Sequence, residues 1–271
     1  MAIMPTLDQV EDVVLSVAEK QNLSQTGVEK FEIKSDGSYV TEVDAALQTS
    51  LKNKLQTLWP QFGFIGEEMS FSAQVEVCKT SKAGYWVLDP LDGTTNFSSG
   101  FLFYGISLAL VIEGQSVLAV VYDPIRKESF TAEQNRGAYL NGERLQASKF
   151  QNLNQCIANV DYKRLVAELS ERLVRSPPYR SQRNLGASVL EWCWLASGRV
   201  QLYLHGGQKL WDFAAGYLIL QESGGAATSL SGLPLDCSKL RKRSVIAASN
   251  SVLLDKWVDW IRTNSKDLYT L

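Results

Sequence analysis

The segment at residues 84–97, Gly-Tyr-Trp-Val-Leu-Asp-Pro-Leu-Asp-Gly-Thr-Thr-Asn-Phe, constrains this chain most. An apolar strand is predicted to end at the proline, and two carboxylates, Asp89 and Asp92, stand there three residues apart. Carboxylates so close repel one another, and a divalent cation between them removes the repulsion. Gly93 permits a tight turn, and the N–H groups of a helix that starts after it favour phosphate oxygens. The segment indicates a metal and phosphate site; the structural alternative is an Asx-type turn in which Asp92 caps the helix that follows.

The composition limits the class of protein and the number of domains only broadly. The 271 residues, 45% hydrophobic and 21% charged, are typical of a soluble globular protein with one large domain or two modest ones. A net charge of -2 gives no general electrostatic basis for nucleic-acid binding. A basic cluster precedes an apolar run, and we interpret it as a solvated loop rather than a binding patch. Its members are Lys239, Arg241, Lys242 and Arg243.

Nothing in the sequence predicts a targeting or membrane segment. The first residues lack the basic region and apolar core of a signal peptide. No apolar stretch approaches the roughly 20 residues that span a bilayer. The four cysteines are widely spaced, without a paired metal-ligand pattern. We therefore expect a cytoplasmic protein with reduced thiols and no membrane partner.

The first half is predicted to be rich in strands. Apolar residues at helical spacing predict an opening helix over 7–18 and a second over 42–58, with Thr41 to Asp44 as a capping box. Short apolar runs predict strands, and a turn-rich segment at 137–142 closes this half. The predicted strands are 62–65, 85–88, 105–113, 117–122 and 128–132.

The second half alternates strands and helices, which predicts a layered α/β arrangement after an α+β half. We place the boundary near residue 150, giving halves at 1–150 and 151–271. The predicted strands are 156–160, 200–204 and 244–248. The predicted helices are 165–174, 188–196, 212–221 and 253–261.

Three further carboxylates bear on the metal hypothesis. Glu67 follows an apolar strand and a glycine, so a loop could aim it inward; a solvated acid is the alternative. Asp212 opens a helix too apolar for the surface, and a helix N-cap there is compatible with metal ligation. Asp44 is the weakest candidate because the capping box already explains it.

Four sequence motifs with these acids follow one another along the chain. They are the upstream Asp44, Gly66-Glu-Glu68, Asp89-Pro-Leu-Asp-Gly-Thr94, and Trp211-Asp212 followed by Gly224-Gly225. With them the chain resembles the inositol monophosphatase family, the lithium-sensitive, magnesium-dependent phosphatases of sugar phosphates and nucleotides. The resemblance implies an α+β fold, a layered α/β/α/β/α sandwich, and a homodimer.

The resemblance also implies the roles of individual residues. Metal ligation falls to Glu67, Asp89, the backbone carbonyl of Leu91, Asp92 and Asp212. The phosphate is held by Gly93, Thr94 and Thr95. Thr94, oriented through Asp44 and Glu67, helps to activate the attacking water. The resemblance also implies two or three magnesium ions, and three would balance the charges of four carboxylates and a phosphate dianion.

The expected reaction is hydrolysis by in-line attack of a metal-activated water. The single histidine weighs against a phosphohistidine intermediate. The expected substrate is inositol monophosphate or a similar small polyol or sugar phosphate. The alternatives are 3′-phosphoadenosine phosphate and histidinol phosphate, and, from another class, a regulatory protein-binding module on the same fold. The intact set of acids favours the enzyme.

Substrate choice is expected to lie in the second half. The resemblance places the leaving alcohol near Gly186, Ala187 and Ser188. Inositol-specific members carry a glutamate seven residues before the ligand aspartate, and here His205 stands at that position. A neutral imidazole accepts one hydrogen bond and cannot reproduce a carboxylate, so inositol specificity is in question. A loop histidine without a substrate role is the alternative.

Overall fold

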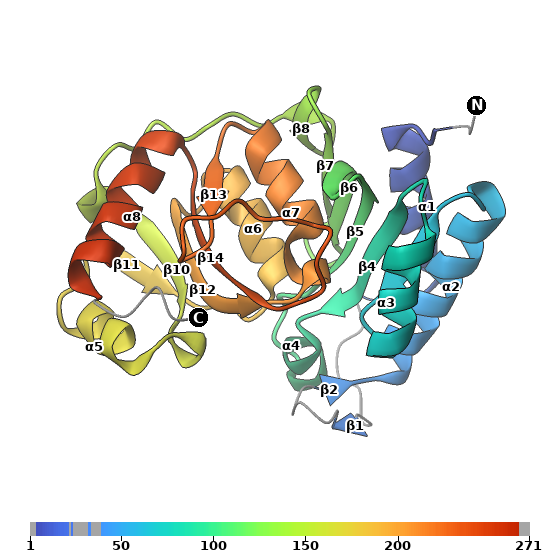
Figure 1. Ribbon diagram of the computed structural model, residues 1–271, viewed down its shortest axis with the longest axis horizontal. Coiled ribbons are helices and arrows are strands. Elements are labelled where there is room, and N and C mark those ends of the chain that lie inside the picture. The colour runs from blue at the N-terminus through green and yellow to red at the C-terminus, as the bar shows by residue number, and fades with distance from the viewer. Residues whose placement is uncertain (1–3, 22, 24–31, 34–38, 266–271) are drawn as a thin grey trace.

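A computed structural model describes residues 4–21, 23, 32–33 and 39–265 of the chain. Two sheets alternate with three helical layers, as Figure 1 shows. The α+β layered α/β/α/β/α sandwich expected from the sequence is confirmed. Within the described residues, no helix combines the length and apolar content needed to cross a membrane.

The first sheet has seven strands in chain order, with β3 parallel to β4 and the others antiparallel. They are β3 (Gly63–Gly66), β4 (Tyr85–Asp92), β5 (Gly105–Ile112), β6 (Gln115–Asp123), β7 (Glu128–Glu133), β8 (Gly137–Leu140) and β9 (Glu143–Arg144). Helices α1 (Leu7–Lys20) and α2 (Glu42–Leu58) cover one face (Figure 1). Helix α3 (Phe71–Thr80) connects β3 to β4, and the short α4 (Thr94–Ser99) follows β4.

The second sheet has the strand order β11-β10-β12-β14-β13. Its strands are β10 (Ile157–Asp161), β11 (Ser181–Arg183), β12 (Leu202–Gln208), β13 (Ala226–Thr228) and β14 (Arg243–Ala248). Helices α6 (Ser188–Ala196) and α7 (Leu210–Glu222) lie between the two sheets, and α5 (Ala167–Arg175) and α8 (Ser251–Asn264) cover the outer face (Figure 1). Short pieces complete the chain: the strand pair β1 (Glu32–Ile33) and β2 (Tyr39–Val40), and the 3₁₀ turns η1 (Leu153–Gln155) and η2 (Tyr162–Arg164).

Apolar side chains fill each space between layers. On α2, Leu47, Leu51 and Leu55 recur every four residues and are fully buried in the cluster that holds Trp86 of β4. Between the sheets, α6 and α7 approach closely at Gly216, where an added Cβ would lie 2.3 Å from the Cβ of Trp192. The outer layer is anchored by Trp257 of α8. The site residues therefore project from a rigid frame.

Most predicted elements are present, among them the opening helix, the helix over 42–58 with its capping box, and the helix over 188–196. The hairpin over 105–122 also forms. The proposed boundary near residue 150 falls in the connection between β9 and β10.

Three local predictions are wrong. Strand β4 does not end at Asp89 but runs to Asp92, because an irregularity in its pairing with β5 between these residues accommodates the proline. Residues 137–140 form strand β8 instead of turns alone, because β7 offers an edge for pairing. His205 lies on β12, not in a loop, since the strand continues through the two following glycines.

Candidate active site

One cavity of about 540 Å³ gathers most of the predicted site residues. It lies where β4, α4, α6 and α7 meet the ends of strands β10, β12 and β14 of the second sheet. Its lining includes Glu67, Leu91, Asp92, Gly93, Thr94, Thr95, Gly186, Ser188, His205 and Asp212. Three predicted residues lie outside the lining: Asp44 and Asp89 are buried behind it, and Ala187 is fully buried.

The end of β4 supplies the central carboxylates. The Asp89 side chain is 1% exposed, and its Oδ1 accepts a hydrogen bond from the Leu91 N–H at 3.2 Å. Asp92 Oδ2 accepts from the Val189 N–H at 2.7 Å, in the first turn of α6. The N-terminus of α6 therefore holds a carboxylate of the first sheet in place. This contact joins the two halves of the chain at the site.

Helix α2 brings Asp44 to the same end of β4. Asp44 is 2% exposed, and its Oδ2 accepts from the N–H and the hydroxyl of Thr41, which completes the predicted capping box. Its other oxygen, Oδ1, lies 3.2 Å from the Thr94 hydroxyl, which is also 3.0 Å from the Leu91 carbonyl. The cap and a contact with Thr94 therefore coexist in one carboxylate.

Glu67 and Asp212 approach from two other elements. Glu67 directly follows β3, and its N–H donates to the Leu88 carbonyl of β4 at 3.1 Å. Asp212 is the third residue of α7, not its cap, and its Oδ2 accepts from the Lys209 N–H at 2.8 Å. The Lys209 ammonium lies 3.8 Å from Glu67 Oε1 and bridges the two elements.

The pKa values of the buried acids Asp89, Asp92 and Asp212 are raised, in part because these acids lie close to one another and to Glu67. Burial raises the pKa of Asp89 well above its usual range, and the charges of Glu67 and Asp92 raise it further. Burial and, second, the charge of Asp212 also raise the pKa of Asp92 well above its usual range. The hydrogen bond from the Val189 N–H acts in the opposite direction but does not outweigh them. Burial, followed by the charge of Glu67, raises the pKa of Asp212 to about 7. The charges of Lys209 and Arg164 lower the pKa of Asp212 but do not offset burial and the repulsion between the acids.

The loop before α6 is fixed by two side chains that sequence reasoning missed. Glu191 Oε1 accepts from the N–H groups of both Leu185 and Gly186 at 3.0 Å. From α4, Asn96 Nδ2 donates to the Leu185 carbonyl at 2.8 Å. Burial raises the pKa of Glu191. A single acid within the otherwise apolar run over 188–196 was the signal that could have identified it.

His205 is engaged at both ring nitrogens. Its Nδ1 accepts from the Gly207 N–H at 3.1 Å, so the ring proton resides on Nε2, which lies 3.3 Å from Asp161 Oδ2. Burial lowers the pKa of His205 to about 4, despite Asp161, and the charges of Arg164 and Lys242 act in the same direction as burial. His205 is therefore neutral near pH 7, and its only acceptor nitrogen is already occupied.

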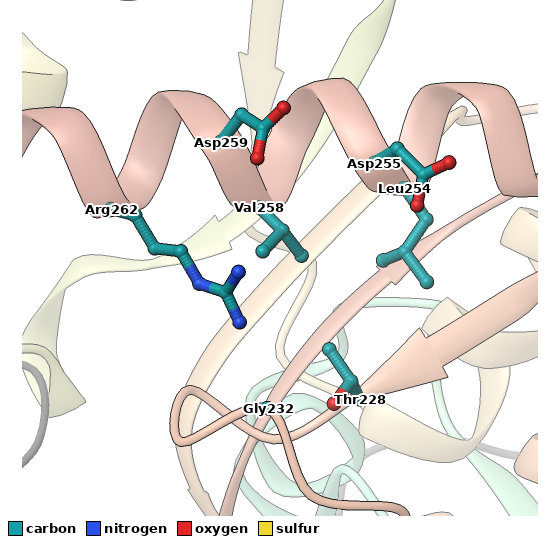
Figure 2. A pocket seen from close by; sticks show the side chains of 7 residues that line it. All are labelled: Thr228, Gly232, Leu254, Asp255, Val258, Asp259 and Arg262. Carbon is teal, nitrogen blue, oxygen red and sulfur yellow. The ribbon is translucent and has the colours of Figure 1, made fainter.

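A second hollow, of about 550 Å³, lies between α8 and the turn after β13 (Figure 2). It is lined by Thr228, Gly232, Leu254, Asp255, Val258, Asp259 and Arg262. None of the predicted site residues contributes to this lining. The candidate active site is therefore the cavity at the end of β4.

The model of the inositol monophosphatase family matches residues 5–265. The chain belongs to this family. Inositol monophosphatase 2 of Solanum lycopersicum is 35% identical over 266 aligned residues, which cover 93% of this chain and 98% of that relative. Nus factor SuhB of Escherichia coli (strain K12) is 34% identical over 204 residues, covering 73% and 74% respectively.

Solved structures agree with this family assignment. The IMPase of Thermotoga maritima is similar with a TM-score of 0.84 and 27% identity, covering 97% of this chain and 98% of that one. This member of the inositol monophosphatase family is therefore a phosphomonoesterase.

Proposed function

We propose that the chain hydrolyses the phosphate ester of a small polyol or sugar with magnesium as cofactor, inositol monophosphate being one candidate. The observation that carries this proposal is the gathering of Glu67, Asp89, Asp92 and Asp212 beside the start of α4. Their mutual repulsion calls for cations, and a phosphate dianion could enter only with such compensation.

The donor set fits magnesium. Among the described residues, no three acidic, His or Cys side chains already converge on one ion position. A magnesium site does not need three converging side chains, because the ion usually keeps several waters and binds one or two carboxylates and the substrate phosphate. We propose that Glu67, Asp89, the Leu91 carbonyl, Asp92 and Asp212 hold two or three such ions. Bound magnesium would stabilise charge on the phosphoryl group and lower the pKa of water.

Thr94 and Asp44 are proposed to handle the proton of the attacking water. The Thr94 hydroxyl is within hydrogen-bonding distance of Asp44 Oδ1 and can accept from a water while donating to that carboxylate. Thr41 holds the other oxygen of Asp44, so the acceptor oxygen has a fixed direction. Glu67 is proposed to help orient this water.

The phosphate is proposed to lie on Gly93, Thr94 and Thr95. Gly93 has a φ of 89°, and an added Cβ would lie 3.0 Å from the Ala187 Cβ. Glycine therefore permits both the turn and the close packing of α6. Because α4 starts at Thr94, the first N–H groups of this helix lack intrahelical acceptors and can donate to phosphate oxygens.

The leaving alcohol is proposed to face Gly186, Ser188 and His205, which line the other side of the cavity. The geometry of His205 supports a role in positioning Asp161 rather than in accepting a hydrogen bond from substrate. The position that carries a glutamate in inositol-specific members therefore offers no such acceptor here. We keep inositol monophosphate as one candidate among polyol phosphates.

Phosphate release from a panel of inositol, sugar and nucleotide phosphates and histidinol phosphate, with and without magnesium, tests this function. We expect magnesium-dependent turnover and inhibition by lithium. No turnover of any member would contradict the proposal and leave the regulatory module as the alternative. Sedimentation of the purified chain tests the homodimer, which rests on the family resemblance alone.

A further inference from the structure

One wall of the cavity, at the end of the second sheet, carries a group of cations. Strands β10, β12 and β14 are neighbours, and Asp161, His205 and Val245 lie in register across them. Lys163 and Arg164 lie in η2, the turn that follows β10, and Lys242 directly precedes β14. All three cations line the cavity. They come from a part of the chain that the phosphate chemistry does not use.

Close packing fixes the position of this cationic wall. An added Cβ at Gly206 would lie 1.7 Å from the Arg164 carbonyl oxygen, so β12 and the turn η2 are in direct contact. An added Cβ at Gly207 would meet nothing within 4 Å, and Gly207 lines the cavity. Gly206 therefore permits the contact between β12 and η2, and Gly207 leaves open space on the cavity side of β12.

The wall has an excess of positive charge. Asp161 is its one carboxylate, and it is paired with the Arg164 guanidinium and faces the Nε2 of neutral His205. Within the part of the chain that the structure describes, Lys163 and Lys242 have no carboxylate within 4 Å. Both lysine side chains are exposed at the cavity. Two ammonium groups are thus available to a ligand.

We propose that the preferred substrate carries a second anionic group, a phosphate or a carboxylate, at the end remote from the scissile phosphate, and that Lys163 and Lys242 bind it. This inference rests on the proposed function and narrows its substrate class. A neutral polyol phosphate would leave the two ammonium groups without a partner. A cationic leaving group such as that of histidinol phosphate would be repelled. Arg164 forms an ion pair with Asp161 and adds its positive charge to the same wall of the cavity.

Three substrates with the same six-carbon chain test the proposal: glucitol 6-phosphate, 6-phosphogluconate and glucitol 1,6-bisphosphate. Initial rates are measured at constant free magnesium. Because each exposed charge contact contributes about 0.2–1 kcal/mol, we expect kcat/KM about tenfold higher for a doubly anionic substrate than for the neutral one. The carboxylate and bisphosphate arms identify which anion is preferred. Added salt should reduce the preference.

The double variant Lys163→Gln/Lys242→Gln should raise KM about tenfold for the preferred doubly anionic substrate and leave KM for glucitol 6-phosphate unchanged. Lys82→Gln/Lys149→Gln is the matched control, because it removes two exposed lysines outside the cavity.

Equal kcat/KM for all three substrates, or the same loss for neutral and doubly anionic substrates in the double variant, would overturn the inference and leave the phosphatase function intact. A preference for histidinol phosphate would overturn it as well. Absence of turnover on every substrate would overturn the proposed function and this inference with it.

Discussion

The two ends of the cavity are built differently. At the acidic end, short side chains are held by backbone groups: Asp92 by the Val189 N–H and Asp212 by the Lys209 N–H. At the cationic end, Lys163 and Lys242 are long, exposed side chains on a turn and a loop. Reaction chemistry needs fixed geometry, whereas charge recognition tolerates motion. In the proposed function, the carboxylates around the end of β4 carry out the reaction and the cations at the end of the second sheet select the substrate.

The largest effect is expected at the acidic end. Asp92→Asn removes a proposed metal ligand, so kcat should fall by about 100-fold or more, because metal stabilisation of transition-state charge contributes several kcal/mol. The matched control is Asp255→Asn, an exposed acid of α8 that lines the separate hollow in Figure 2. Steady-state phosphate release measures both variants. A loss below about tenfold for Asp92→Asn would contradict the assigned division of roles.

The junction between the two ends is expected to show the next largest effect. Glu191→Ala leaves the N–H groups of Leu185 and Gly186 without their acceptor, so the free energy of unfolding should fall by about 2–4 kcal/mol. KM should rise as the loop loosens. Urea unfolding and steady-state kinetics measure the two quantities. Glu191→Gln keeps an acceptor oxygen and should restore much of the free energy of unfolding and of the wild-type KM. Equal losses in the Ala and Gln variants would argue against this positioning role.

Metal removal should reveal the repulsion at the acidic end. The pKa of Asp89, Asp92 and Asp212 is higher in the folded chain than in the unfolded one, so the folded state binds more protons above about pH 4. In EDTA, Tm should therefore fall as the pH rises from about 4 to about 7, the value for Asp212. Magnesium should remove most of this fall. A Tm that is the same with and without magnesium at pH 7 would contradict the metal assignment.

The smallest effect is expected at His205. Its folded-state pKa of about 4 lies below the unfolded value, so its contribution to stability is present above about pH 6.5 and is lost as the pH falls toward 4. Catalysis should consequently show no histidine step near pH 6.5. Comparing the pH profiles of kcat/KM for the wild type and His205→Gln checks this point. A step in the wild type that the variant lacks would indicate direct participation.

Sequence reasoning succeeded where the physical cause is local. The capping box of α2 needs only Thr41 and Asp44, which stand one helical turn apart. It was less successful where pairing partners decide the outcome. Strand β4 continues past Pro90 because β5 pairs again at Asp92, and His205 is part of a strand because β10 and β14 flank it. No local pattern contains those partners.

The sequence by itself indicated the centre of the acidic end, because Asp89 to Thr95 are contiguous and the turn, helix start and carboxylates need no distant residue to be recognised. Tertiary structure brought Glu67 and Asp212 to this segment, and it alone decided the cationic wall. Lys163 and Lys242 are far apart in the chain, and the sequence interpretation placed Lys242 in a solvated basic loop and assigned no role to Lys163. The strand order β10-β12-β14 and the contact at Gly206 bring them to one cavity, where their charges act together.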